Sequence, residues 1–459
     1  MASIAASTAA PAALAPRTRA LLEAPIPGTL LRLAAPNIIL ISVQAALNVL
    51  EAVFVGWLGR DALAGVALVF PLVMLMQTMS AGGMGGGVSS AVARALGAGR
   101  RDEAESLAAH AVLIALGMAA LFTTGMLAGG PALYRAMGGE GSALAAALTY
   151  SHVIFGGAVI VWLLNTLSSI VRGTGTMVLP AAIMSASAMV YLGLAPALVL
   201  GGGPFPRLGV AGTATANLVS FGLSSLVLAG YLVSPWSAVR LTFRGLKLSR
   251  AHFWEILRVG APGSLNTVLT NLTIVLMTGL VGPFGTFALA GYGMGARLEY
   301  LQIPLVFGIG SALVAMVGTN VGAGQIARAE RIAWTGAGLA AGITAAVGLF
   351  GAMFPRVWLG LFTSDPHAQA AGVTYLAIVG PFYGFFGLGL ALYFASQGAG
   401  RLGWPLAAGF LRLFVAAAGG WLAGYWLGWG LPGIFTAMAA ALVLFGVTMA
   451  IALKWGAWR

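Results

Sequence analysis

The chain lacks cysteine and carries little charge. None of its 459 residues is Cys, and only 7% are charged. The absence of cysteine excludes disulfides, thiolate catalysis and cysteine-ligated metal. A soluble domain carries about 25% charged residues, so charge this sparse cannot cover a water-facing surface of this size. We therefore expect lipid to cover most of the protein. The four histidines are scattered without metal-ligand spacing, and we expect neither a metal site nor a cofactor.

Apolar stretches of about 20 residues, long enough to cross a bilayer, recur about twelve times along the chain. They predict an all-α polytopic membrane protein with six spans in each half. The expected spans are 34–58, 64–92, 104–129, 146–171, 179–200, 209–233, 258–282, 288–318, 331–353, 370–396, 403–427 and 430–453.

The second half of the sequence is a diverged copy of the first. Residues 32–65 return at 258–291, displaced by 226 positions, as from Pro36 to Pro262. Further pairs at similar displacement are Gly97 and Gly322, Gly173 and Gly398, and Gly212 and Gly433. Because six spans is an even number, both copies keep one orientation, so the repeats are parallel and related by a pseudo-twofold axis along the membrane normal. Such repeats are typical of transporters whose site lies where the halves meet.

Basic residues fall mainly on one side of the expected spans. Of the 23 Lys and Arg, we assign 17 to that side, four to the other and two, Arg297 and Arg412, to span interiors. The positive-inside rule then predicts both termini in the cytoplasm. The net charge of +12 is therefore interpreted as a topology signal and as contacts to anionic lipid, with no nucleic-acid partner. The expected domains are a disordered cytoplasmic tail (1–30), an N-terminal six-helix lobe (31–233), a cytoplasmic linker (234–257) and a C-terminal six-helix lobe (258–455).

Several motifs resemble those of multidrug and toxic compound extrusion (MATE) transporters. Residues 48–59 (NVLEAVFVGWLG) resemble the first-helix motif of that family, and residues 93–99 (ARALGAG) its signature after the second helix. Residues 317–324 (VGTNVGAG) resemble the second-half counterpart of that signature, and Asn165 ahead of residues 172–175 (RGTG) also fits. The resemblance covers about 30–455, and residues 297–299 (Arg-Leu-Glu) favour the DinF-like branch.

The resemblance implies a two-lobe antiporter, and no enzyme, that expels amphipathic, often cationic, drug-like molecules in exchange for H⁺ or Na⁺. It also implies a bacterial inner (plasma) membrane location, and we expect a monomer. The chain departs from the DinF-like pattern at several positions. Glu51 stands where Asp is usual, Tyr191 and Ala195 where Asn and Asp are frequent, and Asn217 where Thr is usual. Thr270 replaces an acid that other members carry, and the tenth span has none, so we favour H⁺ over Na⁺.

Glu51 is the main candidate for cation coupling, because only it and Glu299 among the eleven acids lie inside spans. Gln44, Asn48 and Glu51 follow at spacings of four and three, so they share one helix face. A carboxyl group held out of water costs free energy when charged and can gain and lose a proton. The resemblance adds Asn165, Tyr191 and Asn217 as partners, and protonation is expected to bend or straighten the first span. A buried acid that only bridges helices is the alternative.

Glu299 has two interpretations, which the sequence leaves open. It can form a structural ion pair with Arg412, or it can face the cleft and meet cationic substrate. Tyr292 and Gln302 share its helix face. Further candidates for the lining of the cleft are Asn266, Thr270, Asn271 and Tyr383.

Two other functions fit a polytopic membrane protein. A flippase for a lipid or lipid-linked precursor predicts a strongly basic cleft, whereas only two cations lie inside spans. A membrane enzyme needs a cluster of Asp, His or Cys at one membrane face, which the sequence lacks. The balance favours export of a cationic or neutral small molecule.

Overall fold

The computed structural model describes residues 15–202 and 204–458, and every regular element within them is a helix. Eleven helices there are long and apolar enough to cross a membrane. A twelfth span results if Gly141–Gly156 and Ala158–Gly173, bent by 46° at a short break, count as one. The predicted all-α polytopic fold is confirmed.

The helices of the first half form the N lobe: α2 (Ile26–Gly56), α3 (Arg60–Thr78) continued by the π-helical turn η1 (Met79–Met84) into α4 (Gly85–Gly97), α5 (Arg101–Ala136), α6 (Gly141–Gly156), α7 (Ala158–Gly173), α8 (Val178–Leu200) and α9 (Val210–Val233). Those of the second half form the C lobe: α10 (Arg250–Val281) with η2 (Gly282–Phe284), α11 (Thr286–Tyr300), α12 (Ile303–Gly322), α13 (Ile326–Met353), α14 (Pro355–Leu359), α15 (Pro366–Val379), η3 (Gly380–Phe382), α16 (Tyr383–Ala399), α17 (Gly403–Phe414), η4 (Val415–Gly419), η5 (Leu422–Trp426) and α18 (Gly430–Lys454).

Two predicted boundaries are wrong. The expected disordered tail contains helix α1 (Pro16–Glu23), whose Leu21 and Leu22 are buried, and α2 already begins at Ile26. Residues 1–14 of that tail lie outside the described residues. The expected linker 234–257 ends early, because α10 begins at Arg250. Burial of apolar side chains accounts for both changes, since Leu21 packs in a cluster with α12 and Ile256 in one with α4.

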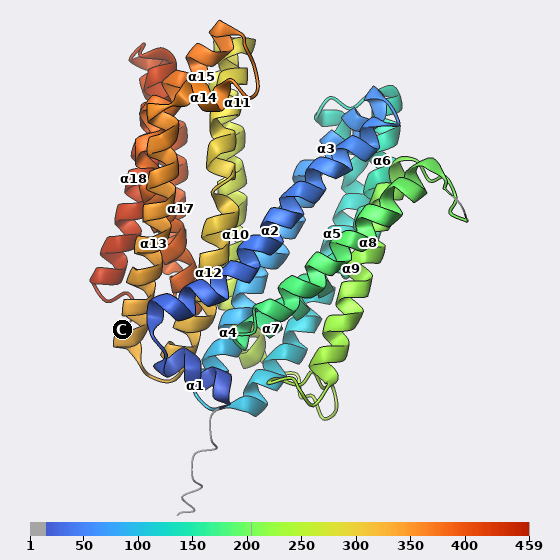
Figure 1. Cartoon of the computed structure of the whole chain (residues 1–459), viewed down its shortest axis with the longest axis vertical. Coiled ribbons are helices and arrows are strands. Elements are labelled where there is room, and N and C mark those ends of the chain that lie inside the picture. The colour runs from blue at the N-terminus through green and yellow to red at the C-terminus, as the bar shows by residue number, and fades with distance from the viewer. Residues whose placement is uncertain (1–14, 203, 459) are drawn as a thin grey trace, which may run out of the picture.

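The two lobes lie close together at the end that carries α1 and the C-terminus, and they diverge toward the opposite end (Figure 1). The first helix of each half begins against the other half. Leu30 and Ala34 of α2 are buried in a cluster with Ile309 of α12, and α10 contacts η1 and α4. This exchange of first helices joins the lobes at their converging end.

Glycines allow α4 and α12 to cross at the converging end. A Cβ atom at Gly97 would overlap the carbonyl oxygen of Thr319, and one at Gly322 would overlap the carbonyl oxygen of Arg94. Gly97 and Gly322 are equivalent positions of the two repeats, so one contact is made twice around the pseudo-twofold axis. Only a residue without a side chain lets the two backbones approach this closely.

The eighth span breaks near its centre, where α11 ends at Tyr300 and α12 begins at Ile303. Pro304 occupies the first turn of α12, where its missing N–H costs least. Glu299 lies in the last turn before this break.

Candidate functional site

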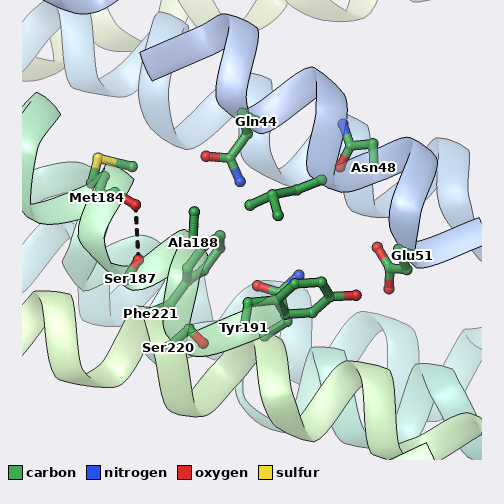
Figure 2. Close-up of a pocket in the computed structure, with 11 residues that line it drawn as sticks. Gln44, Asn48, Glu51, Met184, Ser187, Ala188, Tyr191, Ser220 and Phe221 are labelled. Carbon is green, nitrogen blue, oxygen red and sulfur yellow. Dashed lines mark hydrogen bonds between the residues drawn. The ribbon is translucent and has the colours of Figure 1, made fainter. Parts of the chain in front are cut away.

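The N lobe contains a polar cavity of about 340 Å³, counting its open mouth, between α2, α8 and α9 (Figure 2). Of the six residues predicted to couple a cation, five line it: Gln44, Asn48, Glu51, Tyr191 and Asn217. Figure 2 shows Gln44 and Glu51 pointing from one helix toward the side of the cavity that carries Tyr191 and Ser220. The three residues that share one face of the first span therefore line a single cavity, and their role in cation coupling stays a prediction.

Glu51 is only 8% exposed, and its Oε1 accepts a hydrogen bond from the hydroxyl of Tyr150 in α6 at 2.8 Å. Three further buried oxygens of the same lining, Tyr191 Oη, Asn217 Oδ1 and Ser220 Oγ, have no hydrogen-bond partner among the described residues. Buried polar atoms rarely lack partners. A carboxyl group beside such oxygens can exchange a proton or hold a small cation.

One predicted member of the cluster lies elsewhere, and one true partner of Glu51 was missed. Asn165 does not line the cavity, because its amide donates to Ser80 Oγ at 2.8 Å and so ties α7 to η1. Tyr150 was not predicted, since the periodicity of one helix cannot reveal a partner on another span. Tyr150 stands beside Thr149, Ser151 and His152 in the fourth span, so nothing in the sequence singled it out.

The C lobe holds a larger cavity of about 670 Å³, counting its open mouth. Glu299, Tyr292 and Thr270, all predicted to line a substrate cleft, contribute to its wall together with Arg412. The other predicted members, Gln302, Asn266, Asn271 and Tyr383, lie outside this lining. Gln302 and Tyr383 are completely buried, and Asn271 donates to the carbonyl of Thr267 on its own helix.

The predicted ion pair between Glu299 and Arg412 is not formed; neither residue has an ion-pair partner within the described part of the chain. Glu299 Oε2 accepts from the Tyr375 hydroxyl at 3.3 Å, whereas Arg412 donates to Thr270 Oγ1 at 2.9 Å. The guanidinium also lies 5.0 Å from the centre of the Phe445 ring. Neutral neighbours therefore hold the two charges apart on the wall of one cavity.

A third cavity, of about 270 Å³, lies between the lobes near their converging end. The N lobe contributes Gly82, Ser89 and Arg172, and the C lobe contributes Phe307 and Gln397. Gln397 donates from Nε2 to the carbonyl of Gly82 at 2.9 Å, which links the lobes directly. Arg172 is the single charged residue of this lining.

Duplicated six-helix lobes that meet at one end, with a carboxyl group lining a cavity in each, define a polytopic membrane transporter. The MatE family model matches residues 36–197 and again residues 262–422. The chain therefore belongs to the MatE family, whose members are transporters, not enzymes. The double match also confirms the internal repeat.

The chain is 29% identical to a FAD transporter of Shewanella oneidensis over 379 residues, 82% of each protein. It is also 29% identical to a probable multidrug resistance protein NorM of Deinococcus radiodurans over 441 residues, 92% of this chain and 93% of the relative. Among solved structures, the outward-facing conformation of a multidrug resistance MATE family transporter superposes with a TM-score of 0.86 at 26% identity, covering 96% of this chain and 97% of that one. The DinF-like branch stays a prediction.

Proposed function

We propose that the protein is a secondary antiporter that exports amphipathic, cationic small molecules in exchange for H⁺. It works as a monomer in the bacterial inner membrane with both termini in the cytoplasm. The observation that carries the proposal is Glu51, a carboxyl group in a polar N-lobe cavity with Tyr150 as its hydrogen-bond donor. An acid held out of water inside a membrane protein marks an ion pathway more often than a structural contact.

Coupling requires that binding of a proton to Glu51 changes the shape of the protein. Glu51 lies on α2, and Pro36 interrupts the hydrogen bonding of the same helix. The beginning of α2 packs on the C lobe, whereas Glu51 faces α8 and α9. Protonation of Glu51 weakens its attraction for polar partners, so α2 bends or straightens and moves one lobe against the other.

The direction of opening follows from the proposed topology. The lobes converge at the end that carries α1 and the C-terminus. With that end in the cytoplasm, the lobes diverge toward the outside, the arrangement expected of an outward-facing state. Exchange of a proton for cargo then begins from the external face.

Glu51→Gln tests the proposal, because glutamine keeps the size and hydrogen bonding of the side chain and cannot be deprotonated. In liposomes with an imposed proton gradient, we expect the wild type to transport ethidium and Glu51→Gln to be inactive. Glu103→Gln is the matched control, since Glu103 pairs with Arg100 at an exposed helix start. Transport by Glu51→Gln at the wild-type rate would disprove the coupling role of Glu51.

Sodium is the second candidate ion, because the cavity offers the oxygens of Glu51, Tyr191 and Asn217, which suit a hard cation. Against it, Ala195 and Thr270 replace the acids that the family resemblance associates with additional cation ligands. Imposing H⁺ and Na⁺ gradients separately on the same liposomes distinguishes the two ions. Transport driven by sodium alone at constant pH would exclude proton coupling.

A lipid flippase, or an exporter of a nucleotide such as the FAD named for one relative, needs several cations around an anionic cargo. The cavity between the lobes has Arg172 alone. We therefore include FAD and a fluorescent phospholipid as competing cargoes in the same assay. Their transport in preference to ethidium would replace the cationic-drug assignment.

A further inference from the structure

The C-lobe cavity is lined by two opposite charges, whereas the cation-coupling site in the N lobe is lined by only one charge. As described, the N-lobe cavity is lined by one acid and no base, whereas the C-lobe cavity contains both Glu299 and Arg412. Neither charge has a charged partner at ion-pair distance within the described residues. Opposite charges that line one cavity without a direct ion pair can each bind one end of a third molecule.

Arg412 is held in place by a neutral hydroxyl and forms no direct ion pair among the described residues. It is only 8% exposed; one terminal nitrogen donates to Thr270 at 2.9 Å, and its buried Nε has no partner among the described residues. A buried guanidinium without a carboxylate is costly, and its planar fork suits a carboxylate. The cavity therefore presents a preformed position for a carboxylate group.

Glu299 is oriented by tyrosine hydroxyls from α15 and α16. The Tyr375 hydroxyl donates to its Oε2 at 3.3 Å, and Tyr383 in turn donates to Tyr375 at 3.3 Å. This chain of hydroxyls fixes the carboxylate without cancelling its charge. A protonated amine is the group that satisfies a buried carboxylate best.

The remaining wall is apolar and aromatic. Tyr292 and Phe386 contribute ring surface, and Met277 and Met438 contribute adaptable thioethers. Apolar walls with a few convergent polar groups are the usual composition of a small-molecule site. The volume of about 670 Å³ includes the open mouth, so a bound molecule would lie partly within the cavity and partly in its mouth.

We propose that this C-lobe cavity binds a zwitterionic amphipathic cargo, with its carboxylate on Arg412, its protonated amine on Glu299 and its aromatic body against Tyr292 and Phe386. The inference rests on the proposed export function, which identifies the ligand of this cavity as the exported cargo. It refines the cargo class from a simple cation to a molecule that carries both charges.

Three dansyl probes test the proposal, because they share one fluorophore and differ in the head. Nε-dansyl-lysine carries an amine and a carboxylate, dansylcadaverine has lost only the carboxylate, and 6-(dansylamino)hexanoic acid has lost only the amine. Binding is measured by fluorescence at equilibrium with purified protein in detergent. We expect Nε-dansyl-lysine to bind about tenfold more tightly than either single-charge probe, the effect of one additional charge-assisted hydrogen bond.

Substitutions of Arg412 and Glu299 test the two charged ends of the ligand one at a time. Arg412→Gln is expected to abolish the preference for Nε-dansyl-lysine over dansylcadaverine, and Glu299→Gln the preference over the hexanoic acid. Arg297→Gln is the matched control and should bind as the wild type does, since Arg297 lies against Phe362 outside the cavity lining. If Arg412→Gln fails to fold, Arg412→Lys keeps the charge, loses the fork and is expected to weaken the preference.

The outcomes are decisive and independent of transport. The proposal would be overturned by equal binding of the three probes, by tighter binding of dansylcadaverine or by absence of binding. A preference that is unchanged in both Arg412→Gln and Glu299→Gln would also overturn it. Glu51→Gln should keep the wild-type preference. Failure of gradient-driven efflux would therefore disprove the antiport proposal while leaving the binding result intact.

Discussion

Arg94 of α4 and Glu255 of α10 form an ion pair of 2.8 Å between the two halves at their converging end. The Arg94 side chain is 9% exposed, and it also donates to Ser90 Oγ and to the Gly398 carbonyl of α16 at 3.1 Å. Arg258 reaches the same Glu255 oxygen at 2.6 Å. A single buried guanidinium thus connects one helix of the N lobe to two of the C lobe, and the lobes cannot separate there unless these contacts break.

Glu255→Gln should loosen the converging end. Removing one partner of a largely buried pair leaves Arg94 without a counter-charge, which costs about 1.4 kcal/mol or more and corresponds to a tenfold change in an equilibrium. Because the chain has no native cysteine, Thr319→Cys provides a single reporter at the buried crossing of α4 and α12. We expect maleimide labelling of this cysteine to be about tenfold faster in Glu255→Gln.

Glu105→Gln is the control for that experiment. Glu105 pairs with Arg101 one turn away on α5 and also accepts a hydrogen bond from the backbone N–H of Arg240; neither contact crosses to the C lobe. Maleimide labelling of Thr319→Cys should be as fast with Glu105→Gln as without it. Equal rates in Glu255→Gln and Glu105→Gln would show that the Arg94 pair does not hold the lobes together.

Tyr150→Phe should impair transport without removing the carboxyl group of Glu51. The lost donor contributes about 1.5–3 kcal/mol to a charged acceptor, so we expect gradient-driven efflux of ethidium to fall about tenfold. Tyr134→Phe is the control, since it removes a buried hydroxyl bonded to Ser151 at 2.7 Å away from the cavity lining. A similar loss in both variants would indicate general destabilisation.

The outline of the fold could be predicted because it depends on patterns along one chain. Apolar length predicted the spans, and the displacement of 226 between Pro36 and Pro262 predicted the two lobes, which the double family match confirms. The linker prediction was wrong because charge was taken as a sign of a loop. Of the charged residues expected in the linker, Arg250 and Glu255 lie in α10, where Glu255 pairs with Arg94 and Arg258.

The candidate site was predictable only within single helices. Spacings of four and three identified Gln44, Asn48 and Glu51 on one face of α2, and the structure brings them to one cavity. Contacts between helices were not predictable in this way: Tyr150 was missed, and the sequence left open whether Glu299 pairs with Arg412 or faces a cavity. Proximity between spans depends on how whole helices cross, which local periodicity does not encode.

Gly97→Ala and Gly322→Ala should each destabilise the described conformation by about 1–3 kcal/mol, the usual cost of forcing a methyl group into a packed interface. The added methyl would overlap the Thr319 or Arg94 carbonyl, and neither can retreat without separating α4 from α12. Because the positions are equivalent in the two repeats, we expect similar losses of melting temperature in detergent from either substitution. Gly117→Ala in α5 is the control, since its methyl group would meet nothing within 4 Å. Retention of the wild-type melting temperature by both Gly97→Ala and Gly322→Ala would mean that the lobes are held together elsewhere, and the Arg94–Glu255 pair would then be the first contact to reconsider.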